Sequence, residues 1–177
     1  AGRGIGVGDY QLVFAGGVES MSRAPLVMSK ANHAFSRGQQ MFDTTIGWRF
    51  VNPEMQAMYG VESMPETAEN VAVDYAISRQ DQDAFALQSQ QRYAAADQAG
   101  VFADEILPVP LDHLAAPANL VDRDEHPRPQ VTLEKLVKLP GVNGPGSSVT
   151  AGNASGINDG AAALLLASQA ALSSHGL

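Results

Sequence analysis

Residues 149–160 read VTAGNASGINDG, and the apolar run AAALLLA follows at residues 161–167. The first segment carries three glycines among small polar residues, a composition typical of a tight turn. The apolar run is short, continuous and bounded by turn residues, which is typical of a strand inside a sheet. We therefore expect a turn, then a strand over residues 161–167, then a helix that begins within residues 168–174.

A second glycine-rich stretch lies near the start of the chain. Residues 10–15 read YQLVFA, and Gly16-Gly17 follows directly. This pattern predicts a buried strand that ends at the two glycines. Glycines also alternate through residues 2–8, but they match neither of the glycine patterns that bind nucleotide phosphates. We therefore expect no nucleotide site there.

The sequence predicts several helix starts in the middle of the chain. Ser63 and Glu66 have the spacing of a capping box and predict a helix that runs to about residue 77. Residues 78–81 open a second helix, which Gly100 is placed to end. Thr132 can cap a shorter third helix. The remaining predictions are an irregular segment at 22–62 with a short helix at 53–59, an edge strand at 106–109 and an exposed loop at 111–130.

Composition excludes several classes of function. Hydrophobic residues make up 45% and charged residues 17%, as in soluble globular proteins, and no apolar run approaches the roughly 20 residues that cross a membrane. The net charge of -8 argues against nucleic acid as a partner. The chain contains no cysteine, which excludes disulfides, thiolate metal sites and a cysteine nucleophile within it. We expect neither a metal nor a resident cofactor.

Several separate segments resemble thiolases. Residues 15–22 (AGGVESMS) are similar to one glycine-rich thiolase motif, and residues 149–163 (VTAGNASGINDGAAA) are similar to the signature near the end of the inserted loop domain of that family. Residues 63–72 (SMPETAENVA) and 78–86 (SRQDQDAFA) resemble two of its helix starts. The motifs occur in family order and span essentially the whole chain, so the chain is identified as similar to thiolases.

One subfamily is favoured. Residues 35–37 (FSR) and 42–53 (FDTTIGWRFVNP) resemble the 3-oxoadipyl-CoA thiolases of aromatic-compound degradation. The resemblance implies an acyltransferase that converts 3-oxoadipyl-CoA and coenzyme A into succinyl-CoA and acetyl-CoA. It also implies a cytoplasmic enzyme that assembles as a homodimer or homotetramer.

The resemblance implies an α/β thiolase fold. Residues 1–21 would belong to the N-terminal βαβαβ half, residues 22–148 to an inserted α+β loop domain that binds coenzyme A, and residues 149–177 to the return into the N-terminal half. The chain would then be an internal piece of a longer thiolase. The nucleophilic cysteine would lie upstream of Ala1, and the catalytic histidine and second cysteine downstream of Leu177.

Thiolase chemistry cannot be carried by this chain alone. Thiolysis uses a thiolate that attacks and leaves again, and a nearby histidine activates it. No cysteine is present, and we expect the four histidines to be surface or structural residues: His33, His113, His126 and His175. We therefore expect no catalytic residue in this chain and no thiolase activity from it.

Binding is the function that remains. The resemblance places Arg128 at the adenine-phosphate end of coenzyme A, where a guanidinium can pair with phosphate. It places Ser155, with Ala151 and Gly152, along the pantetheine arm. The other residues that it implies are Met64 at the acyl end and Leu136 and Leu139 on the adenine side.

Two arginines are candidates for substrate selectivity. A 3-oxoadipyl chain ends in a carboxylate, and a buried carboxylate needs a partner. Arg37 and Arg49 lie in the segment that resembles the 3-oxoadipyl subfamily, although either could instead hold the loop or an oligomer contact.

Two other interpretations of the function stay open. The chain could be a binding module that holds an acyl-CoA without chemistry, or part of a thiolase for other 3-oxoacyl-CoA substrates, including those of fatty acid metabolism. A cysteine upstream and histidine and cysteine motifs downstream in the coding sequence would favour the enzyme.

Overall fold

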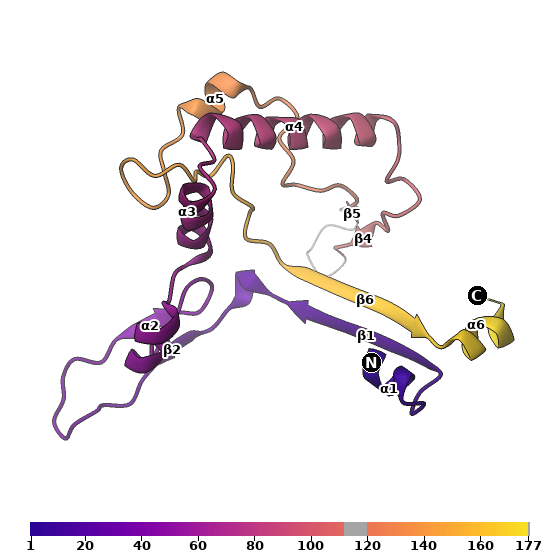
Figure 1. Ribbon diagram of the computed structural model, residues 1–177, viewed down its shortest axis with the longest axis horizontal. Coiled ribbons are helices and arrows are strands. Elements are labelled where there is room, and N and C mark those ends of the chain that lie inside the picture. Colours follow the sequence, from indigo (N-terminus) through magenta and orange to yellow (C-terminus); the bar gives the residue numbers. More distant parts are fainter. Residues whose placement is uncertain (112–119, 177) are drawn as a thin grey trace. The chain divides into compact units, whose positions relative to one another are not determined.

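The structure is a computed structural model that describes residues 1–111 and 120–176 (Figure 1). The chain divides into two compact units. Unit 1 comprises Ala1–Pro53 and Ile157–Leu177, and unit 2 is the continuous segment Glu54–Gly156. Unit 2 therefore interrupts the sequence of unit 1. The domain boundaries expected at residues 21/22 and 148/149 differ from this division and stay a prediction.

A two-stranded antiparallel ribbon forms the centre of unit 1. Strand β1 (Leu12–Glu19) pairs with β6 (Gly160–Ala167), from Leu12 opposite Ala167 to Glu19 opposite Gly160. The strand predicted at 161–167 is confirmed, whereas the end predicted for the first strand at Gly16 is wrong. A Cβ atom on Gly16 would lie 2.5 Å from the Ala162 carbonyl oxygen. Glycine therefore continues this strand by letting the two backbones come close.

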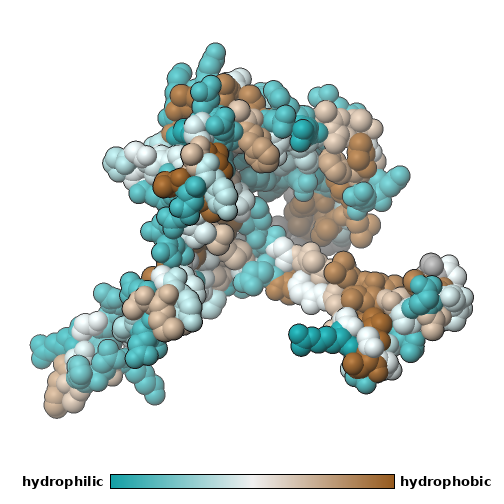
Figure 2. Space-filling model, in the orientation of Figure 1, coloured by the Kyte–Doolittle hydropathy of each residue, from teal (hydrophilic) through white to brown (hydrophobic). Residues whose placement is uncertain are grey.

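The ribbon is more exposed than expected. The first strand was predicted to be buried, but the exposed fractions of Phe14, Val18 and Leu164 are 78%, 80% and 67%. Apolar side chains show along this ribbon in Figure 2. The cause is topological, since β1 and β6 have no third strand beside them in the part of the chain that the structure describes.

Short helices flank the ribbon. Helix α1 (Gly2–Gly6) precedes β1, although glycine disfavours helix. Helix α6 (Gln169–His175) follows β6 and confirms the final predicted helix. The Ser168 side chain caps α6 by accepting from the Ala171 N–H at 3.1 Å.

Unit 1 also contains a short hairpin that the sequence analysis missed. After the 3-10 helix η1 (Met21–Arg23), strand β2 (Leu26–Met28) pairs antiparallel with β3 (Met41–Asp43). Strands of three residues are too short to show a clear alternation of polar and apolar residues. The Phe42 and Phe50 rings pack edge to face at 5.6 Å between centroids.

Helices α2 (Pro53–Tyr59) and α3 (Met64–Asp74) begin where the sequence predicts. Helix α2 has the predicted bounds. Helix α3 opens on the predicted capping box: the Ser63 N–H donates to Glu66 Oε2 at 2.7 Å, and Ser63 Oγ accepts from the Glu66 N–H at 3.4 Å. It ends before the predicted residue 77, because Ala76 takes a left-handed conformation with φ 52°.

Helix α4 (Arg79–Gln98) is the longest element, with 20 residues. Ser78 Oγ caps it by accepting from the Asp81 N–H at 3.1 Å, and Gly100 follows its end with φ 71°. Both predicted ends are thereby confirmed.

The rest of unit 2 is mostly loop. Strand β4 (Val109–Pro110) pairs with β5 (Leu120–Val121), and helix α5 (Leu133–Val137) is capped by Thr132 as predicted. The strand predicted at 106–109 starts later, because the Ile106 N–H still bonds the Phe102 carbonyl at 3.0 Å. Residues 112–119 of the predicted loop, including His113, lie outside the described residues, and 120–121 are strand rather than loop.

The core of unit 2 is small and partly polar. Its buried residues are Ala72, Leu136 and Val149 together with Asp83 and Thr150. No helix in the described part of the chain is long and apolar enough to span a membrane.

Candidate functional site

A stripe of polar side chains along α4 organises unit 2. Asp83, Gln90, Tyr93 and Asp97 lie 4, 11, 14 and 18 residues after Arg79, close to whole helical turns, so all five share one face. Each of the five bonds to a segment that comes later in the chain. The stripe therefore holds the loops of unit 2 by polar contacts, and the Tyr93 ring also stacks on Phe102 at 5.4 Å between centroids.

Asp83 lies at the centre of this network and is fully buried. Its Oδ2 accepts from Arg79 Nε at 2.8 Å, and its Oδ1 accepts from Asn153 Nδ2 at 3.0 Å. The Arg79 Nη2 group donates in turn to the carbonyls of Leu136 at 2.7 Å and Leu139 at 3.2 Å. A buried carboxylate is costly unless it is paired and hydrogen-bonded, so these partners fix one geometry.

Asn153 shapes the turn that opens the segment 149–156. Its Oδ1 accepts from the Thr150 N–H at 2.7 Å, and its Nδ2 also donates to the Ser148 carbonyl at 3.1 Å. Thr150 is fully buried, and its Oγ1 accepts from the Gly152 N–H at 3.2 Å. Every polar atom of the Asn153 side chain is therefore used to hold the turn in one conformation.

Glu69 of helix α3 holds residues 148 and 149, which lead into this turn. Its carboxylate accepts from the Ser148 N–H and Oγ, both at 2.7 Å, and from the Val149 N–H at 3.0 Å. Burial acts to raise the pKa of Glu69, but the Ser148 hydroxyl and the two backbone N–H groups outweigh it and lower the pKa.

Three of the predicted site residues meet in a tight apolar contact. A Cβ atom added to Gly152 would lie 2.5 Å from both Leu136 Cδ2 and Leu139 Cδ1. Leu136 is buried, with 3% of its surface exposed. Gly152 thus lets the turn approach the two leucines whose carbonyls accept from Arg79.

Arg128 is exposed and folded over its own loop. Its N–H donates to Gln90 Oε1 of α4 at 2.7 Å. Its Nη1 donates to the carbonyls of Glu125 and His126 at 2.7 Å and of Pro127 at 3.0 Å. Within the described residues, the hydrogen bonds of its guanidinium use Nη1 alone.

The other predicted ligand residues are on the surface of unit 2. Ala151 and Ser155 are exposed, and Met64 is 75% exposed. Unit 2 thus contains all seven residues expected at coenzyme A, namely Met64, Arg128, Leu136, Leu139, Ala151, Gly152 and Ser155. Their roles at the ligand stay a prediction.

Both selectivity candidates lie in unit 1. Arg37 is exposed. Arg49 donates from Nε to the Asp43 carbonyl at 3.3 Å and from Nη1 to the Gly47 carbonyl, so it holds its own turn. The Asp43 carboxylate also braces this turn by accepting from the Thr45 N–H and Oγ1, and these two bonds lower the pKa of Asp43.

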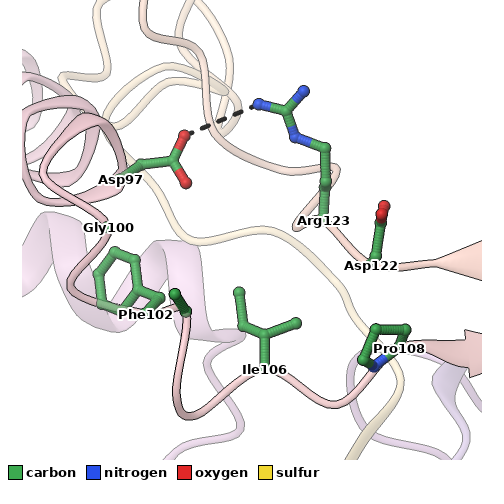
Figure 3. Close-up of a pocket in the computed structure, with 8 residues that line it drawn as sticks. Asp97, Gly100, Phe102, Ile106, Pro108, Asp122 and Arg123 are labelled. Carbon is green, nitrogen blue, oxygen red and sulfur yellow. Dashed lines mark ion pairs between the residues drawn. The ribbon is translucent and has the colours of Figure 1, made fainter.

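A separate pocket of about 290 Å³ lies beyond the C-terminal end of α4 (Figure 3). Phe102, Ile106 and Pro108 line it on the segment after α4, and Asp97 faces Arg123 across a 3.8 Å ion pair. With Asp122, the lining holds two carboxylates and one guanidinium, so it does not suit a phosphate group. This pocket contains none of the residues expected at coenzyme A.

Sequence reasoning missed the residues that hold the site, which are Arg79, Asp83, Asn153 and Glu69. One signal was available: the polar residues of α4 repeat at whole helical turns. His33, His126 and His175 are exposed, which confirms the prediction for those three. Among the described residues, no group of three or more histidine, aspartate or glutamate side chains could hold a metal ion.

Comparison with solved structures defines the class of fold. The chain resembles human mitochondrial 3-ketoacyl-CoA thiolase, solved in complex with CoA, with a TM-score of 0.79 and 40% identity over 98% of this chain and 42% of that one. Residues 1–170 match the family described as the N-terminal domain of thiolase. The chain belongs to the thiolase family, and its α/β fold is the thiolase fold.

Two relatives of known name are more than half identical to the chain. The chain is 62% identical over 99% of its length to the beta-ketoadipyl-CoA thiolase of Pseudomonas putida. It is 56% identical over its full length to the 3-oxoadipyl-CoA/3-oxo-5,6-dehydrosuberyl-CoA thiolase of Escherichia coli K12. It spans 44% of the length of each of these two proteins.

Proposed function

We propose that this chain is part of a longer thiolase that acts on 3-oxoadipyl-CoA. In the reaction, the bond between carbons 2 and 3 of the 3-oxoadipyl chain breaks, and a bond forms between carbon 3 and the sulfur of coenzyme A. The thiol proton ends on carbon 2, so the products are succinyl-CoA and acetyl-CoA. The observation that carries the proposal is the 62% identity, over 99% of the chain, to a beta-ketoadipyl-CoA thiolase.

The part of this chain in the reaction is to bind coenzyme A. The seven residues that the family resemblance places at the ligand belong to unit 2. Leu136 and Leu139 form a leucine pair whose carbonyls accept from Arg79. Arg79 and Asp83 link this leucine pair to the turn that carries Ala151 and Ser155. The exposed guanidinium of Arg128 suits a phosphate, and the exposed small residues suit a narrow amide-bearing arm.

The covalent chemistry must come from residues outside this chain. The attacking group is a cysteine thiolate, and this chain contains no cysteine. Its contribution to rate is therefore the orientation of the thioester against groups supplied by the rest of the enzyme. The expected homo-oligomer and the cytoplasmic location stay predictions of the same proposal.

Steady-state kinetics on the full-length enzyme test the proposal. We expect turnover of 3-oxoadipyl-CoA with free coenzyme A, and release of succinyl-CoA and acetyl-CoA in equal amounts. A neutral 3-oxoacyl-CoA of similar length serves as the comparison substrate. Higher kcat/KM on the neutral substrate would indicate a thiolase for other 3-oxoacyl-CoA substrates. Binding of coenzyme A without turnover of either would indicate a binding module.

A further inference from the structure

A fully buried carboxylate lies beneath the proposed coenzyme A surface rather than on it. Asp83 is fully buried and bonds Arg79 with one carboxylate oxygen and Asn153 with the other. Asn153 is 70 residues away in the sequence. The two partners lead to different parts of the surface, one to the leucine pair and one to the turn.

Each arm of this arrangement controls one set of proposed ligand contacts. Through Arg79, Asp83 fixes the carbonyls of Leu136 and Leu139. Through Asn153, it fixes the turn that carries Ala151 and Gly152 and leads to Ser155. The arms meet again where Gly152 packs against both leucines.

We infer that Asp83 is a positioning residue for the pantetheine arm of coenzyme A, acting through Asn153 and Arg79. The inference rests on the proposed function. Asp83 does not touch the ligand, because it has no exposed surface. Its effect is to hold the leucine pair and the turn at one separation, so that this part of the proposed coenzyme A surface is formed before the thioester arrives.

The inference depends on the acceptor character of Asp83 rather than on its size. A carboxylate offers an acceptor to Arg79 Nε and another to Asn153 Nδ2. Asparagine has nearly the same shape but only one acceptor, so its NH₂ group must face one of these donors. A buried donor without a partner is costly, and one of the two links breaks.

Asn153 cannot restore the lost link by rotating its amide. Its Oδ1 already accepts from the Thr150 N–H, and its Nδ2 also donates to the Ser148 carbonyl. Exchange of the two ends would place donors against the Thr150 N–H and an acceptor against the Ser148 carbonyl. In Asp83→Asn, either the link to the turn or the link to the two leucines is therefore lost even when the fold is kept.

The test compares Asp83→Asn with Asp81→Asn in the full-length enzyme. Asp81 lies on the same helix but is exposed, and its side chain accepts from Ser78. We expect Asp83→Asn to raise the KM for coenzyme A by about 10-fold or more, with kcat per active site changed by less than about 3-fold. Asp81→Asn should leave both within about 2-fold.

Dephospho-coenzyme A locates the effect along the ligand. It lacks the 3′-phosphate but keeps the pantetheine arm, so Asp83→Asn should raise its KM by the same factor. Arg128→Ala should instead raise the KM for coenzyme A much more than that for dephospho-coenzyme A. A purely structural role for Asp83 would lower Tm and the fraction of active sites, but would leave the KM of the folded enzyme unchanged.

Each outcome decides the question. An unchanged KM in Asp83→Asn overturns the inference while wild-type turnover leaves the proposed function intact. If wild type neither binds coenzyme A nor turns over a 3-oxoacyl-CoA, the proposed function itself fails. If Asp83→Asn does not fold, Asn153→Ser removes the same link and keeps an oxygen for the Thr150 N–H. An unchanged KM in that variant would equally overturn the inference.

Discussion

Gly152 leaves no room for a methyl group where the turn meets α5. We expect Gly152→Ala to lower the free energy of unfolding by about 1–3 kcal/mol, because the added Cβ overlaps Leu136 and Leu139. Chemical denaturation measures this loss. Gly38→Ala is the control, since nothing lies within 4 Å of a Cβ at that position. Equal stability of Gly152→Ala and wild type would show that the leucines move aside freely.

Arg128 is the residue most directly tied to the proposed ligand. We expect Arg128→Ala to weaken coenzyme A binding by about 1–3 kcal/mol, because charge-assisted bonds to phosphate are lost. The Arg128 side chain also bonds backbone carbonyls of its own loop, and Arg128→Ala removes these bonds. The loop keeps other contacts, including the bond from the backbone N–H of residue 128 to Gln90. Calorimetry on both proteins measures the difference. Equal affinities would remove Arg128 from the site.

Arg37 and Arg49 make different predictions for substrate choice. Arg49 holds its own turn, so Arg49→Ala should lower kcat/KM alike on 3-oxoadipyl-CoA and on a neutral 3-oxoacyl-CoA. Arg37→Ala should lower kcat/KM on the diacid by about 10-fold more than on the neutral substrate, if Arg37 pairs with the distal carboxylate. Parallel losses in both variants would place selectivity elsewhere.

Helix α3 is joined to the segment 148–149 by a single carboxylate. The folded pKa of Glu69 is lowered, so its stabilising contribution is present above the unfolded pKa and is lost as the pH falls through the folded pKa. Glu69→Gln should therefore be less stable than wild type at neutral pH. The difference should shrink below about pH 4.3, the ordinary glutamate value.

Denaturant unfolding at several pH values measures this difference. Glu134→Gln on α5 provides the control, because Glu134 is exposed. A gap between Glu69→Gln and wild type that stays constant from neutral to acid pH would show that the three hydrogen bonds do not depend on the charge of Glu69.

The isolated chain is expected to lack thiolase activity. Thiolysis requires a cysteine thiolate, and none of the 177 residues is cysteine. The loss of the 3-oxoacyl-CoA enolate absorbance, in the presence of coenzyme A, measures turnover. Any rate above the uncatalysed one from the pure chain would contradict this prediction. The full-length enzyme, prepared in the same way, serves as the positive control.

The isolated chain is also expected to associate in solution. The β1–β6 ribbon exposes large apolar side chains and two strand edges, which favour contact between copies. Phe14→Lys should reduce this association, because it places a charge on the exposed ribbon. Phe35→Lys changes an exposed side chain on a loop and should have less effect. Light scattering that gives a monomer mass for the unchanged chain at high concentration would contradict the prediction.

The sequence by itself determined the local features of this protein. The helix starts at Ser63, Ser78 and Thr132 were predictable because a capping side chain bonds a backbone N–H only three residues away. Strand β6 was predictable because its apolar run is continuous and bounded by turn residues. The thiolase family was recognisable because its motifs are short, contiguous and in order.

Only the tertiary structure decided which residues support the site. Asp83 and Asn153 each look like an ordinary polar residue in sequence, and their pairing across 70 residues depends on how the chain folds back onto α4. The extent of β1 was likewise decided by its partner strand. Glycine usually weakens a strand, but at Gly16 the backbone of Ala162 lies so close that no Cβ atom would fit. Local chemistry sets where elements begin, whereas burial and long-range hydrogen bonds exist only once the elements have packed together.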